Sequence, residues 1–178
     1  MLRLSPAVFR TVLPTAFLLT AALAFPMGLP LPLAAQESDE APPEFRLGLS
    51  WFDLEGEQAS PGLEFSLRPG GALPLGIRPQ LGAMGNGDGG FYVYGGLTRE
   101  FELGAGFRVS PSLSAGLYQQ GESLDLGSPL EFRSGLLLDR AVWRDHRLGV
   151  FLYHLSNAGL AQRNPGVEVL GLAYGLRW

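Results

Sequence analysis

A histidine, a serine and a glutamate lie within fifteen residues of one another near the C-terminus of the chain. His154 and Ser156 stand two positions apart, so on a strand both side chains point to the same face. Glu168 begins the next apolar segment, and we expect it beside His154 if the two segments form a hairpin. A base that activates a hydroxyl and a carboxylate that orients the base are the working parts of a serine hydrolase.

The residues that follow Ser156 are candidates for stabilising an oxyanion. Asn157 carries a side-chain amide, and Ala158 and Gly159 offer backbone N–H groups. Donors of this kind stabilise the negative charge that develops on a carbonyl oxygen during acyl transfer. The alternative interpretation is that the histidine, the serine and the glutamate are ordinary polar residues beside a turn.

The N-terminal residues 1–35 are typical of a secretory signal peptide, since two arginines precede the apolar run 11–24. Small residues offer cleavage sites after Ala24 and after Ala35, and the second is favoured. An uncleaved membrane anchor is the alternative, but the prolines in this segment disfavour a spanning helix. Residues 36–44 are then an acidic lead-in, predicted to be a mobile tail.

The composition excludes several classes of protein. The 178 residues carry a net charge of −4 and no cysteine, so we expect neither disulfides nor a lipid-modified thiol. No basic surface for nucleic acid is indicated. No metal site is predicted.

Beyond residue 44 the sequence alternates between apolar and small or polar residues, with glycine-rich breaks. This pattern predicts eight strands. Their expected ranges are 45–54, 61–68, 74–83, 91–101, 107–119, 130–140, 147–156 and 167–178.

The last of these strands decides which all-β architecture we predict. One face is apolar, and the other carries small residues and one arginine. The apolar face holds Leu170, Leu172, Tyr174, Leu176 and Trp178, and the other face holds Gly171, Ala173, Gly175 and Arg177. An apolar outer wall around a narrow interior is typical of transmembrane barrels, and a terminal aromatic residue is similar to bacterial outer-membrane barrels.

The expected connections alternate between short turns and longer loops, which is the outer-membrane pattern. We therefore predict that residues 45–178 form an all-β fold, an antiparallel transmembrane β-barrel of about eight strands in the bacterial outer membrane. The loop 157–166 then faces outward, and the three candidate residues lie at the outer rim, near the outer leaflet.

The string H-x-S-N-A-G at residues 154–159, followed by N-P-G-x-E at 164–168, resembles the PagL family of outer-membrane lipid A 3-O-deacylases. The resemblance implies that Ser156 is the nucleophile, His154 the base and Glu168 the acid that orients it. It also implies that Asn164 shapes the loop, and it supports the oxyanion candidates after the serine.

The implied substrate is lipid A within lipopolysaccharide, with hydrolysis of the acyl ester at position 3 of the proximal glucosamine. No metal or organic cofactor is expected, and outer-membrane lipids are the expected surroundings. Two other functions stay open: a structural or adhesive outer-membrane barrel, and a soluble periplasmic barrel that binds a lipid. The oligomeric state is also open, with a homodimer as one alternative.

Overall fold

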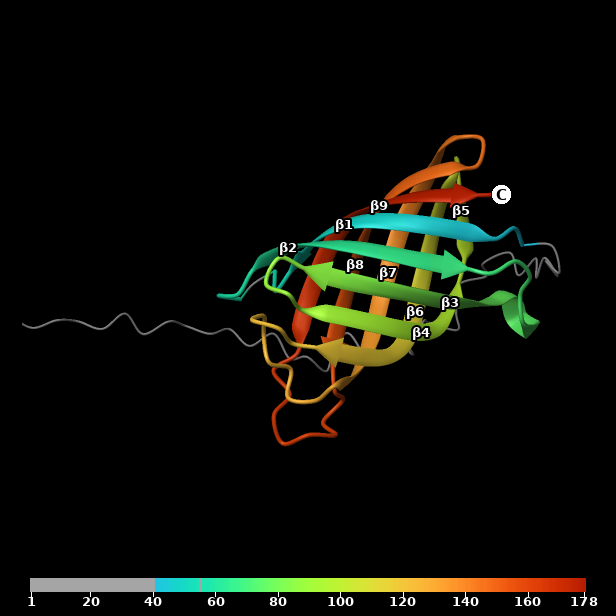
Figure 1. Ribbon diagram of the computed structural model, residues 1–178. Helices are drawn as coiled ribbons and strands as arrows, with labels where there is room; N and C mark the ends of the chain where they lie inside the picture. The colour runs from blue at the N-terminus through green and yellow to red at the C-terminus, as the bar shows by residue number, and fades with distance from the viewer. Residues whose placement is uncertain (1–40, 55) are drawn as a thin grey trace, which may run out of the picture. The chain divides into compact units, whose positions relative to one another are not determined.

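The computed structural model describes residues 41–54 and 56–178, which form an antiparallel β-barrel (Figure 1). The strands are β1 (Glu44–Phe52), β2 (Ser60–Arg68), β3 (Ile77–Asn86), β4 (Phe91–Arg99), β5 (Phe101–Gly104), β6 (Phe107–Gln119), β7 (Leu130–Trp143), β8 (His146–Ser156) and β9 (Val167–Arg177). A short 3-10 turn, η1 (Pro74–Gly76), precedes β3. The predicted signal peptide and residues 36–40 of the lead-in lie outside the described residues.

Apart from β4 and β5, each strand pairs with its neighbours along the chain, and β9 pairs with β1 to close the barrel (Figure 1). β4 and β5 are two parts of one wall strand that is interrupted at Glu100, because both pair with β6. The wall therefore has eight strands, and the predicted fold class is confirmed. No helix in the described part of the chain is long and apolar enough to cross a membrane.

The distribution of side chains is the reverse of that in a soluble protein. Leu49 and Leu172 on the outer wall are each 63% exposed, whereas Glu44 and Arg108 inside the barrel are fully buried. Large apolar side chains cover the outer wall on every long strand. This arrangement suits a wall that faces lipid, and soluble monomers rarely expose so much contiguous apolar surface.

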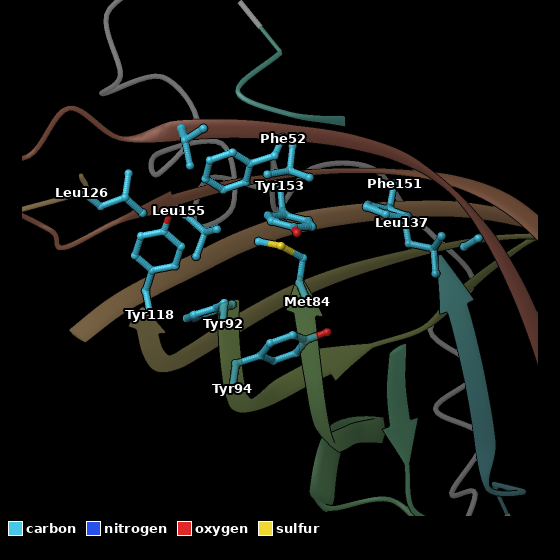
Figure 2. Close-up of a cluster of buried hydrophobic side chains, with 13 residues drawn as sticks. Phe52, Met84, Tyr92, Tyr94, Tyr118, Leu126, Leu137, Phe151, Tyr153 and Leu155 are labelled. Atoms are coloured by element: carbon cyan, nitrogen blue, oxygen red, sulfur yellow. The ribbon is translucent and has the colours of Figure 1, made fainter. Parts of the chain in front are cut away.

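The interior has two unlike halves. Toward the end where β8 and β9 are joined, aromatic and aliphatic side chains pack together (Figure 2). This cluster includes Phe52, Met84, Tyr92, Tyr94, Tyr118, Leu126, Leu137, Phe151, Tyr153, Leu155, Val167, Val169 and Ala173. Toward the other end, where β1 begins and β9 ends, buried arginines and carboxylates form ion pairs.

Several strand boundaries differ from the sequence-based expectation by one to three residues, and two of them have a clear physical reason or consequence. β3 begins at Ile77 rather than at Pro74, because Leu75 and Gly76 adopt positive φ values of 68° and 69° that a strand does not accept. Glu44, which the acidic composition grouped with the lead-in, is the first residue of β1 and is fully buried. Its carboxylate forms ion pairs with arginines inside the barrel.

Candidate active site

His154 on β8 and Glu168 on β9 are direct cross-strand partners. His154 Nδ1 lies 2.9 Å from Glu168 Oε1, which is a hydrogen-bond distance. The imidazole is 11% exposed and the carboxylate 36% exposed. The hairpin register expected from the sequence is therefore present, and the carboxylate holds the Nδ1 side of the ring.

Ser156 is the last residue of β8 and lies on the same outward face as His154. Its cross-strand partner on β7 is Phe132, which is also turned outward. Within residues 41–54 and 56–178, the Ser156 hydroxyl makes no hydrogen bond. Because Glu168 occupies Nδ1, the nitrogen of His154 left for this serine is Nε2. Catalytic hydrogen bonds are often long before substrate binds, so this geometry is compatible with a nucleophile and its base.

Gly166 packs against the imidazole of His154. A methyl group at Gly166 would lie 2.6 Å from Cε1 and 3.1 Å from Nε2 of the ring. Gly166 also has a positive φ of 67°, which disfavours any side chain there. The glycine thus lets the loop pass close beside the ring, a contact that sequence reasoning missed although N-P-G stood in the motif.

Asn157 points into the barrel and is fully buried. Its Nδ2 donates to the carbonyl of Leu126 at 2.9 Å and to that of Arg163 at 2.7 Å. Its Oδ1 accepts a hydrogen bond from the N–H of Gly159 at 3.0 Å. The side-chain amide expected to face an oxyanion is therefore fully used in holding the loop, and the N–H of Gly159 is used as well.

Two further residues of the loop 157–166 have free donors. Ala158 is exposed with a positive φ of 53°, and its N–H makes no hydrogen bond within the described residues. Asn164 accepts a hydrogen bond from the Asn157 N–H through Oδ1 at 3.1 Å, which ties the two ends of the loop together. Its Nδ2 group has no partner in the described part of the chain.

The loop between β6 and β7 braces the loop that follows Ser156. Asp125 and Arg163 form an exposed ion pair at 2.9 Å, and Leu126 is buried beneath Asn157. Gly127 approaches Arg163 so closely that a methyl group there would lie 2.1 Å from its carbonyl oxygen. The paired residues of the two loops are 31 and 38 positions apart in sequence, so no local pattern predicts this brace.

An apolar groove of about 450 Å³ lies on the outer wall, over β1, β2, β8 and β9. Leu170 lines it, and Leu170 is the next residue after Glu168 on the same face of β9. The other lining residues are Leu49, Ser50, Trp51, Pro61, Gly62, Val150, Gly171 and Leu172. The groove therefore begins two positions from Glu168 along β9 and lies on the lipid-facing wall.

A model of one protein family, described as Lipid A 3-O-deacylase (PagL), matches residues 41–177. The match covers the whole described barrel apart from its last residue. This chain belongs to the PagL family. The resemblance inferred from residues 154–168 is thereby confirmed at the level of the family.

The crystal structure of the outer membrane enzyme PagL resembles the barrel with a TM-score of 0.59 and 19% identity, covering 76% of this chain and 99% of that one. A de novo designed transmembrane β-barrel gives a TM-score of 0.52 and 8% identity, covering 80% of this chain and 99% of the design. At such identities the likeness shows the fold alone. No curated protein sequence matches this chain.

Proposed function

We propose that this PagL-family member is a serine-type esterase that removes the ester-linked 3-O acyl chain of lipid A. The observation that carries the proposal is the hydrogen bond between His154 Nδ1 and Glu168 Oε1, with Ser156 on the same outward face. Family membership supports deacylation of lipid A, and the pair supports the choice of nucleophile, base and acid.

In the proposed reaction, Ser156 Oγ attacks the ester carbonyl and His154 Nε2 accepts its proton. Glu168 stabilises the imidazolium through Nδ1–H. The tetrahedral intermediate breaks the bond to the sugar oxygen, which takes the proton from His154 and leaves as the 3-hydroxyl. Water, activated by the same imidazole, then hydrolyses the acyl-serine to free fatty acid and restores Ser156.

The negative charge on the tetrahedral intermediate needs hydrogen-bond donors near Ser156. Because Asn157 and Gly159 already donate within the loop, we assign this role first to the N–H of Ala158 and to Nδ2 of Asn164. Asn157 then acts through the loop, by fixing the backbone that presents these donors.

The position of the three residues on the outer wall fits a substrate that stays in the membrane. We extend the outer-membrane location of the similar PagL structure to this chain and place the active site at the outer leaflet. The acyl chain would remain on the lipid-facing wall in the apolar groove beside Leu170, while the sugar meets the loop 157–166. A structural or adhesive barrel remains the competing function.

Mass spectrometry of lipid A tests the proposal in cells that produce the wild-type chain or the Ser156→Ala variant. Wild-type cells should show lipid A lighter by one hydroxyacyl group, and variant cells should keep the acyl chain at equal barrel levels in the outer membrane. Unchanged lipid A in wild-type cells would favour the structural barrel. Loss of a phosphate would indicate a different enzyme.

A further inference from the structure

A cavity of about 40 Å³ lies inside the barrel, away from the outward-facing candidate triad. Its polar lining comes from both the charged half of the interior and the middle of the barrel. The lining residues that bear on the argument are Arg46, Glu64, Ser66, Arg68, Ser110 and Arg133. A cavity needs only about 10–15 Å³ to hold one water-sized particle, so this one has room for a small ion.

The ion-pair network on one side of the cavity carries more arginines than carboxylates. Its acids are Glu44, Glu100 and Asp139, and its bases are Arg46, Arg68, Arg78, Arg108, Arg147 and Arg177. Arginine stays protonated in proteins, so this excess of positive charge cannot be removed by deprotonation. Unneutralised charge in a low-dielectric interior is strongly unfavourable.

Four donors of the lining lack a partner among the described residues, and one of them, Nε of Arg133, belongs to the ion pair with Glu64 on the other side of the cavity. The other three are Nε of Arg46, Nε of Arg68 and the hydroxyl of Ser110. These residues are 6%, 3% and 1% exposed, so bulk water does not solvate them. A guanidinium has no acceptor atom, which means that the missing partner must be an acceptor.

The other side of the cavity is electrically balanced. Glu64 Oε1 pairs with Arg133 at 2.9 Å and accepts a hydrogen bond from the Tyr94 hydroxyl, while Glu64 Oε2 and Arg133 Nε have no partner among the described residues. The net charge that faces the cavity is therefore that of the arginines of the network.

We propose that this cavity binds a small monovalent anion, chloride, held by Arg46, Arg68 and Ser110. The ion accepts hydrogen bonds from the unused donors of these three residues and offsets part of the buried positive charge. It ties β1, β2 and β6 together inside the barrel, and its role is in stability rather than in turnover.

Bromide is the probe for a crystallographic test, because it replaces chloride and scatters anomalously. Crystals of the detergent-solubilised barrel in sodium bromide should show an anomalous peak within contact distance of Arg46 Nε and Arg68 Nε. A cavity filled only by water, without anomalous signal, would overturn the proposal.

Thermal unfolding gives a second test in solution. On gels the folded and the heat-unfolded barrel migrate as separate bands, and the temperature at which half of the protein has unfolded is the midpoint. This midpoint should rise with chloride concentration and then level off. Gluconate at the same ionic strength should not raise it in this way. Arg68→Gln and Ser110→Val should each reduce the rise of the midpoint with chloride. Ser110→Val provides the test if the arginine variant does not fold. Arg163→Gln, on an exposed loop, should keep this rise. Equal midpoints in chloride and gluconate for the wild-type barrel would contradict anion binding.

Discussion

His154 Nδ1 and Glu168 Oε1 lie 2.9 Å apart on two neighbouring strands of the barrel wall. The orientation of the imidazole is therefore set by strand register rather than by a loop. Of the three proposed catalytic residues, only Ser156 adjoins a loop, since it ends β8. Base and acid can thus stay fixed while the loop 157–166 adapts to a sugar headgroup.

The first prediction separates the roles of base and acid. His154→Ala should lower the deacylation rate about as much as removal of the serine, on the order of 10⁴-fold or more, because base and nucleophile act as a unit. Glu168→Gln should lower it by roughly 10²- to 10⁴-fold, since an amide orients the ring without stabilising the imidazolium. Single-turnover assays on purified lipid A give both rates.

Both variants should still fold as barrels, which is seen as different migration on gels before and after boiling. The reason is that the two side chains lie on the outer wall rather than in the packed interior. A folded Glu168→Ala protein with the wild-type rate would show that this carboxylate is only a rim residue.

Gly166→Ala should impair catalysis without disturbing the barrel. The added methyl group would lie 2.6 Å from His154 Cε1, so the ring must move or the loop must shift. Misplacement of a catalytic group by about 1 Å can lower the rate on the order of 10²-fold. Steady-state kinetics should show the loss mainly in kcat.

Gly71→Ala is the matched control for this variant. Gly71 also has a positive φ, of 83°, but no atom lies within 4 Å of a methyl group placed there. Equal losses in the two alanine variants would assign the effect to backbone strain and not to the imidazole.

Asn157→Ala should disorganise the loop after Ser156. The change leaves the carbonyls of Leu126 and Arg163 without their donor, at about 1–3 kcal/mol for each buried group. We expect a large loss of rate together with faster proteolysis of residues 157–166. Asn164→Ala removes one hydrogen bond of the loop, so it should cause less proteolysis while still lowering the rate. A fully active Asn157→Ala protein would contradict the bracing role.

Arg108→Met tests the ion-pair network inside the barrel. Arg108 is fully buried and contacts Glu44, Glu100 and Asp139, so its removal breaks three buried ion pairs at once, although each carboxylate keeps other arginine partners. The free energy of unfolding should fall by about 3–5 kcal/mol. Arg163→Gln, which breaks the exposed pair with Asp125, should change it by less than about 1 kcal/mol. Denaturant titrations followed by tryptophan fluorescence compare the two, and similar values would argue against the network as a stabilising element.

The two-residue alternation of apolar and polar side chains was sufficient to predict the eight wall strands. The pairing of His154 with Glu168 followed from the register of a hairpin between neighbouring strands. The ion pairs inside the barrel were not predictable in this way. Arg46 meets Asp139 across the lumen, and that contact depends on closure and stagger of the whole wall. Asn157 stands three positions after the outward-facing His154, so strand alternation predicts that it points inward. The sequence motif instead suggested a role for its side-chain amide at the oxyanion.

The most direct test of the proposed function is a single-turnover assay of Ser156→Ala, purified in detergent and shown to be heat-modifiable, with lipid A that carries its 3-O acyl chain. We predict that the wild-type protein releases one hydroxy fatty acid per lipid A and that the variant releases none above background. Release by the folded variant at the wild-type rate would contradict Ser156 as the nucleophile, and with it the serine-type mechanism.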